Sequence, residues 1–221
     1  GVFDCECFCL CWRYCTAGTF MAALQALLRV LENGILAIDM SCNTRKTVCM
    51  VFSPRQKRKV VSPHFPPLRL FGTDLLYVDN FKYLGHIIDN KLNDDADIQR
   101  EIRNLFTRAN ILTRRFSLCS QSVKVALFKS YCISLYGCAL WRNHTVSSLS
   151  KLRSCYHRCV KTFFGYKRHD SMTAVLFKLS IPSFNTLLHN SRCILRSQTV
   201  NCINSLLQAC CNRVAAIIWR W

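Results

Sequence analysis

Residues 81–116 read FKYLGHIIDNKLNDDADIQREIRNLFTRANILTRRF, and within this stretch the spacing of apolar side chains changes from that of a strand to that of a helix. Apolar residues first alternate, and after the acidic run that ends at Asp97 they recur every three or four positions. Asp94, Asp95 and Asp97 favour a helix start, because carboxylates stabilise the positive end of the helix dipole. The sequence therefore predicts an α+β chain in which a small β-sheet with one helix is followed by a mostly helical region.

The predicted helix begins near Ile98, runs for about five turns and has an apolar face and a cationic face. It opens a basic region, because residues 98–221 contain 19 Lys and Arg against Glu101 and Asp170, and the whole chain carries a net charge of +18. Nucleic acid is the natural partner of such a region. Solvated cations that serve solubility alone are the alternative, and an anionic membrane surface is less favoured. The apolar face comprises Ile98, Ile102, Leu105, Ala109, Leu112 and Phe116, and the cationic face Arg100, Arg103, Arg108, Arg114 and Arg115.

Before residue 81 the pattern indicates one helix and several short strands. Leucines at three- and four-residue spacing predict a helix over 21–33 that stops at Asn33-Gly34, since glycine often ends a helix in the left-handed conformation. KTVCMVF, residues 46–52, alternates as a half-buried strand does. LRLFGTDLLYV, residues 68–78, predicts a hairpin with Gly72-Thr73 at its turn, and FKYLGHIID predicts a third strand.

Beyond the long helix, two further helical segments and one or two shorter helices are expected. The apolar pattern predicts helices from Ser122 to about Trp141 and from Val146 to about Tyr166. The last pattern is broken at Pro182, because proline removes a backbone donor from a helix. No apolar run reaches the roughly 20 residues that a membrane span needs, so no membrane partner is expected.

Patterns for metal binding and catalysis are weak throughout the chain. Cys5, Cys7, Cys9 and Cys11 alternate at the start, yet the sequence has no Cys-x-x-Cys pair, and its six histidines are interpreted as lacking a partner at ligand spacing. The sixteen cysteines follow no secretory signal pattern. Reduced thiols in the nucleus or cytoplasm are therefore expected, and secretion is not. The sequence predicts no metal site and no bound cofactor, and it leaves the oligomeric state open.

Four passages together resemble the reverse transcriptases of non-LTR (LINE-type) retrotransposons. They are LQALLRVLENGILAIDMSCNTRKTVCMVF, FKYLGHIID, LFKSYCISLYGCALW and LRSCYHRCVKTFFG, and they occur in the family's order within residues 22–190. The resemblance implies a remnant of the polymerase palm over 21–92, thumb-like helices over 93–142 and a helical connector over 143–221. It also implies RNA-directed DNA polymerase as the parent activity, with Mg²⁺ as the cofactor of the intact enzyme.

The resemblance assigns candidate nucleic-acid-binding residues. Lys46 would lie near the phosphates of the incoming nucleotide, or else it is a lysine at a strand start in solvent. Lys82, Tyr83 and Gly85 fall in the string that matches the family's primer-grip hairpin, which holds the last phosphates of the primer. An ordinary palm strand with Tyr83 inward fits the same residues. In the thumb, which follows the duplex through backbone contacts, the candidates are Arg100, Arg103, Arg114 and Arg115.

The resemblance supplies no active site. The Tyr-Ala-Asp-Asp hairpin expected within residues 5–20 is absent, and reading the codons of residues 10–22 one base later allows Tyr-Ala-Gly-Asp followed by the family's Ala-Pro-Ser turn. Residues 1–20 are therefore interpreted as an out-of-frame, ill-packed segment, and no catalytic residue is assigned. The expected function is sequence-independent binding of RNA or an RNA–DNA hybrid by an inactive reverse transcriptase fragment. The alternative is a basic helical protein-interaction module with no enzymatic or nucleic-acid role.

Overall fold

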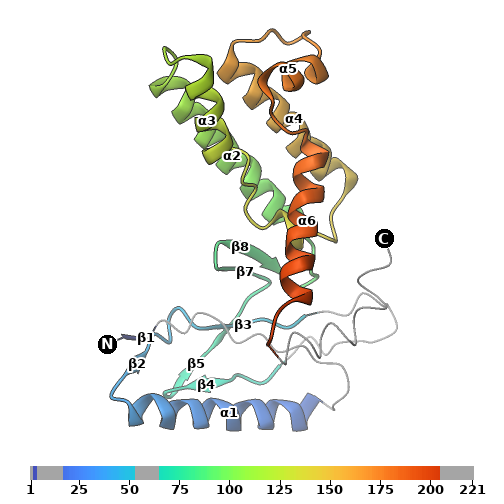
Figure 1. Ribbon diagram of the computed structural model, residues 1–221. Helices are drawn as coiled ribbons and strands as arrows, with labels where there is room; N and C mark the ends of the chain where they lie inside the picture. Colours follow the sequence, from blue (N-terminus) through green and yellow to red (C-terminus); the bar gives the residue numbers. More distant parts are fainter. Residues whose placement is uncertain (1, 4–16, 53–64, 205–221) are drawn as a thin grey trace. The chain divides into compact units, whose positions relative to one another are not determined.

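The computed structural model describes residues 2–3, 17–52 and 65–204 of the chain (Figure 1). It has a mixed α+β fold that is mostly helical, as the sequence predicts. The chain divides into two compact units, Gly1–Asp97 and Ile98–Trp221. Of residues 1–20, which are interpreted from the sequence as an out-of-frame, ill-packed segment, positions 1 and 4–16 lie outside the described residues, whereas 2–3 form a short strand and 17–20 are helical.

The first unit is built around one long helix, α1, Ala17–Ala37. One face of α1 packs against the short strand β4, Arg69–Leu70 (Figure 1). The side chain of Gln25 on α1 forms hydrogen bonds with both backbone groups of Arg69. Arg69 N donates to Gln25 Oε1 at 2.8 Å, and Gln25 Nε2 donates to Arg69 O at 2.9 Å. The hydrophobic cluster at α1 contains Met21, Leu28, Leu68, Leu70 and Leu75.

The prediction that α1 stops at Asn33-Gly34 is wrong, because the helix continues through Gly34 to Ala37. Ile35 lies two turns after Leu28 on the same face and is buried like it. Burying such a side chain contributes about 1.5–3 kcal/mol, which exceeds the roughly 1 kcal/mol that a glycine costs inside a helix. The chain then turns at Asp39, whose φ of 53° is left-handed.

Among the described residues, the strands are short and form four separate pairs. Two pairs are parallel and two are antiparallel. The parallel pairs are β1, Val2–Phe3, with β2, Ser41–Cys42, and β3, Val48–Cys49, with β6, Leu76–Tyr77; the antiparallel pairs are β4 with β5, Thr73–Asp74, and β7, Asn80–Tyr83, with β8, His86–Asp89.

Both antiparallel pairs are hairpins with two-residue turns. The first hairpin is confirmed, but its turn lies at Phe71-Gly72, one residue before the predicted place. The second hairpin folds FKYLGHIID back on itself at Leu84-Gly85, so the prediction of a single strand is wrong. The two turn residues have φ values of 45° and 84°. Positive φ at both positions is the geometry that matches the twist of the flanking strands.

The second unit is a set of helices that begins with α2, Asp95–Arg115. The predicted apolar face of α2 is confirmed, since Ile98, Leu105 and Leu112 are buried. The helix predicted from Ser122 to about Trp141 ends instead at Tyr131. The other elements are α3, Gln121–Tyr131, the 3₁₀ turn η1, Cys138–Leu140, α4, Val146–Phe164, α5, Met172–Leu179, and α6, Phe184–Val200.

A single hydrophobic core joins the helices of the second unit. Phe128 is fully buried, and its ring lies 5.8–6.1 Å from the rings of Tyr156, Phe163 and Phe164. Trp141 is 2% exposed and follows η1, which packs on α6. The core therefore unites residues that the family resemblance assigns to the thumb, 93–142, and to the connector, 143–221. Within the described part of the chain, no helix is long and apolar enough to cross a membrane.

The core also contains a thiol that makes stability depend on pH. Burial raises the pKa of Cys132 from 9.0 to about 11. Because the folded state holds this proton more tightly than the unfolded chain, its stabilisation is complete below pH 9 and is lost as the pH rises through 11. We expect the free energy of unfolding to fall by on the order of 2 kcal/mol between these pH values. Urea denaturation across this range measures the loss, and a Cys132→Ala variant with the same pH dependence would contradict it.

Candidate nucleic-acid interface

The β7–β8 hairpin brings three candidate residues together. Lys82 and Tyr83 end β7 and are exposed, and Gly85 forms the turn. Tyr83 is 39% exposed, whereas Phe81, which the alternative of an ordinary palm strand also turns inward, is half-buried. The register pairs Lys82 with Ile87 and Tyr83 with His86. The hairpin tip thus presents a cation, an aromatic ring and a backbone turn to solvent.

Asp97 on the first turn of α2 holds this hairpin. Its Oδ1 accepts a hydrogen bond from Ile87 N at 3.0 Å, and its Oδ2 lies 3.2 Å from His86 Nδ1. The Asp97 side chain is only 3% exposed. Sequence analysis assigned Asp97 to the helix dipole alone, since residue spacing carries no signal for a partner ten positions upstream. Asp97 is therefore a positioning residue that the sequence did not reveal.

Lys46 lies on a different turn, between β2 and β3. Its backbone N donates to the carbonyl oxygen of Asn43 at 3.1 Å and lies 3.3 Å from the Asn43 side-chain oxygen. Thr47 is buried and donates its hydroxyl to the same carbonyl at 3.0 Å. The turn holds the backbone before β3, while the Lys46 side chain is exposed. This position fits either interpretation of Lys46 made from the sequence.

The candidate arginines of α2 divide into two groups. Arg103, Arg114 and Arg115 are exposed. Arg103 and Arg114 are eleven residues apart, which places them within about 20° on one side of the helix and about 16 Å along its axis. Arg100 is buried, and its guanidinium lies 3.2 Å from Glu101 Oε2 and 3.5 Å from the Tyr136 carbonyl oxygen. The assignment of Arg100 to the solvent-facing cationic side is therefore wrong.

Glu101 explains why Arg100 turns inward. Its side chain is fully buried, and it accepts hydrogen bonds from the guanidinium groups of Arg100 and Arg108. A buried carboxylate requires cationic partners, because transfer of an unpaired charge out of water is very costly. Two of the five arginines of the predicted cationic face are thus committed to an internal ion cluster.

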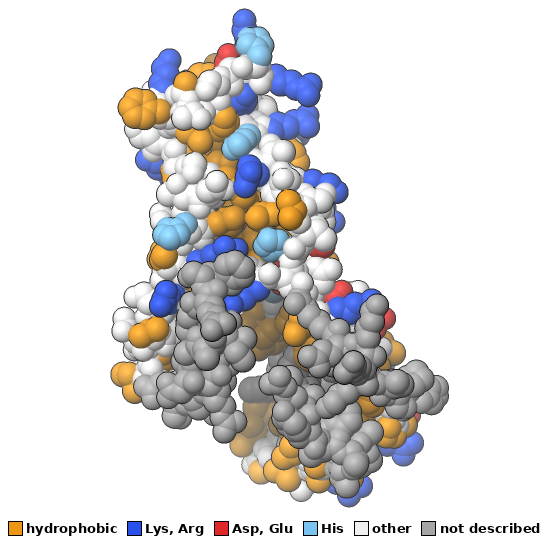
Figure 2. Space-filling view, turned by 90° about the vertical axis from the view of Figure 1, so that its right-hand side faces the viewer, with side chains coloured by type: hydrophobic (Ala, Val, Ile, Leu, Met, Phe, Trp, Pro, Cys, Tyr) orange, Lys and Arg blue, Asp and Glu red, His pale blue; other side chains and the backbone are white. Residues whose placement is uncertain are grey.

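Asp170, the second acidic residue of this unit, also has hydrogen-bond partners within the chain. Asp170 accepts a hydrogen bond from Lys167 N at 2.7 Å, and its backbone oxygen accepts one from Lys161 Nζ. Residues 98–221 contain no third Asp or Glu, so their remaining cations have no further side-chain carboxylate in the unit to pair with. Figure 2 shows Lys and Arg side chains at several places on the surface of this unit.

The thiols and imidazoles contain one pair that sequence analysis missed. His189 and Cys193 lie four residues apart on α6, and their Nε2 and Sγ atoms are 3.4 Å apart. A search for His-x-x-x-Cys spacing would have found them. A buried pair, Cys155 and Cys159, has its sulfurs 4.0 Å apart, and the hydrogen bond between the two thiols, together with burial, raises the pKa of Cys159. Across residues 17–52 and 65–204, no three His, Cys, Asp or Glu side chains gather as a metal site.

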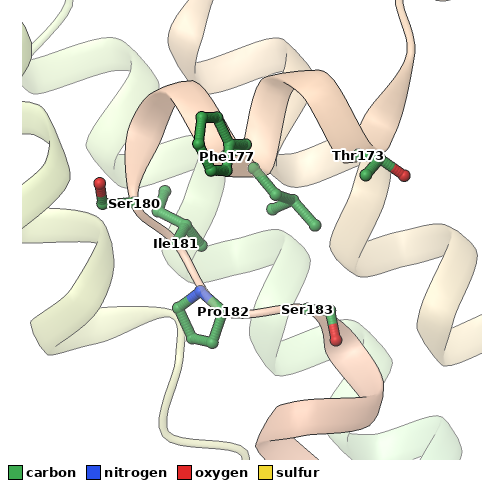
Figure 3. Close-up of a pocket in the computed structure, with 7 residues that line it drawn as sticks. Thr173, Phe177, Ser180, Ile181, Pro182 and Ser183 are labelled. Carbon is green, nitrogen blue, oxygen red and sulfur yellow. The ribbon is translucent and has the colours of Figure 1, made fainter.

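An open hollow of about 740 Å³ lies where α5 meets α6 (Figure 3). Pro182 separates the two helices, which confirms the predicted break, and Ser180 ends α5 with a φ of 50°. Phe177 stands at the rim and is 88% exposed. The hollow is lined by Thr173, Leu176, Phe177, Ser180, Ile181, Pro182 and Ser183, and these residues include no charged group.

Comparison of the chain with protein-family models, curated proteins and solved structures found no match. The resemblance to reverse transcriptases therefore rests on the four passages alone.

Proposed function

We propose that this chain is part of a non-LTR retrotransposon reverse transcriptase that has lost its polymerase activity and retains sequence-independent binding to RNA and RNA–DNA hybrids. The order of the four passages supports the family. One electrostatic observation supports the proposed binding. Both side-chain carboxylates of residues 98–221 already have partners within the chain, whereas Arg103, Arg114 and Arg115 are exposed.

Two separate candidate surfaces, one in each compact unit, would contact the sugar–phosphate backbone. Arg103 and Arg114 form one cationic side of α2, and guanidinium groups bind phosphate oxygens in a bidentate manner. At the hairpin tip, Lys82 supplies a further cation, and Gly85 in the turn has no side chain that would hinder close approach to its backbone. Contacts of this kind position a nucleic acid without reading its bases.

Fluorescence anisotropy of the full chain with a labelled RNA–DNA hybrid tests this function. We expect binding at low salt that weakens steeply and linearly on a plot of log affinity against log salt, because the exposed cations release counterions from the phosphates. Hybrids of unrelated sequence should bind with similar affinity. The proposal fails if the chain has no affinity for any hybrid even at the lowest salt concentration.

A protein-interaction module remains the second candidate, because α1 exposes apolar side chains. Leu27 and Val30 are 60% and 67% exposed, and Ala23, Gly34 and Ala37 extend the same side of the helix. Exposed apolar stripes of this kind mark interaction surfaces. Undetectable nucleic-acid binding at low salt would favour this candidate over the first.

A further inference from the structure

Helix α6 carries an exposed thiol and an exposed imidazole whose sulfur and nitrogen atoms lie close together. His189 and Cys193 are one turn apart, and both lie on the solvent side of α6. Among the described cysteines, Cys193 alone is exposed. Arg192, the cation adjacent in sequence, extends toward the carbonyl oxygen of Trp141 at 3.5 Å. The pair is therefore accessible from solvent.

The separation of the two donor atoms fits a single tetrahedral metal ion. Zinc binds thiolate sulfur at about 2.3 Å and imidazole nitrogen at about 2.0–2.1 Å. At a tetrahedral angle these bond lengths place the sulfur and nitrogen about 3.5 Å apart. The Sγ and Nε2 atoms are 3.4 Å apart in the folded chain. A metal ion can therefore bind without any change in the backbone of α6.

We propose that His189 and Cys193 form a two-point binding site for Zn²⁺ or a chemically similar divalent transition metal. On binding, the thiol of Cys193 loses its proton to solvent, and one sulfur–metal and one nitrogen–metal bond replace two metal–water bonds. No electron is transferred. The site is independent of the proposed nucleic-acid function.

The site differs from a structural zinc centre. Structural centres use four protein ligands, whereas no third His, Cys, Asp or Glu joins this pair within the described part of the chain. The remaining positions on the metal are left to water or to an external ligand. Metal removal is accordingly expected to leave the helical content of the chain unchanged.

Co²⁺ serves as the probe, because its thiolate complexes absorb in the near ultraviolet. The experiment uses the full chain with serine at the cysteines outside the described residues. We expect a charge-transfer band that saturates at one Co²⁺ per chain. Cys193→Ser should abolish the band, and His189→Asn should weaken Co²⁺ binding at least about tenfold. The serine positions are Cys5, Cys7, Cys9, Cys11, Cys15, Cys210 and Cys211.

Three results would overturn the site: no band, a band that survives Cys193→Ser, or equal affinity after His189→Asn. Circular dichroism checks that each variant is folded. A second measurement needs no substitution: Zn²⁺ should slow iodoacetamide labelling of Cys193 in the unmodified chain, read by mass spectrometry, and leave labelling of Cys202 unchanged. Equal slowing at both cysteines, or none at Cys193, would also contradict the proposal.

Discussion

Replacing Glu101 with Gln is expected to destabilise the helical unit by about 3–5 kcal/mol. The substitution removes the buried negative charge that Arg100 and Arg108 share and leaves two guanidinium groups without a counterion. Arg108 is the more affected, because its Nε is buried and has no hydrogen-bond partner among the described residues. Urea denaturation followed by far-ultraviolet circular dichroism measures the loss.

Two variants make this prediction specific. Asp74→Asn breaks the exposed ion pair between Arg69 and Asp74, and it should cost less than about 1 kcal/mol because solvent screens that pair. R100M/E101L/R108M removes all three charges together and should be more stable than Glu101→Gln alone, since apolar groups can replace a buried ion cluster. A triple variant as unstable as Glu101→Gln, or a Glu101→Gln chain as stable as the unmodified one, would contradict the role of the charges.

Changing Arg103, Arg114 and Arg115 together to Gln is expected to have the largest effect on hybrid binding. Each lost phosphate contact lowers the slope of log affinity against log salt by about one. We therefore expect a slope smaller by about three and an affinity at low salt reduced at least about tenfold. The measurement is a salt titration by fluorescence anisotropy, with the same labelled RNA–DNA hybrid for each variant.

A second triple variant separates a defined interface from general attraction. Lys167, Arg168 and Lys178 are exposed cations near α5, and changing them to Gln removes the same net charge. If α2 forms the contact, this control should keep most of the affinity and nearly the full salt slope. Equal losses in the two variants would mean that binding depends on net charge and not on α2.

The parts of the fold that the sequence predicted well depend on local signals. Helix α4 was expected from Val146 to about Tyr166 and spans Val146–Phe164. Its start is set by Thr145, whose side chain accepts a hydrogen bond from Ser148 N, and its end by Gly165 in the left-handed conformation. These groups lie within four residues of the helix ends, so they are readable from the sequence.

The wrong predictions of secondary structure concern segments whose conformation depends on contacts with residues distant in the sequence. The apolar run after Ser122 reads as one helix, yet α3 ends at Tyr131, and Leu135, Cys138 and Trp141 reach the core from the following segment, which contains the 3₁₀ turn η1. Burial favours apolar side chains in helices and loops alike, so the pattern alone does not separate them. The hairpin at Leu84-Gly85 was implied only by the family resemblance, because the periodicity of FKYLGHIID by itself reads as a single strand.

The sequence by itself determined the α+β class, the strong positive charge and the apolar face of α2, because composition and periodicity are properties of the chain. Only the tertiary structure decided which cations remain available. Arg100 and Arg103 are three residues apart on α2, but Arg100 lies against Glu101 and the carbonyl of Tyr136, whereas Arg103 faces solvent. A contact across 36 residues has no local signature, since its energy depends on burial and charge pairing that exist only once the helices have packed.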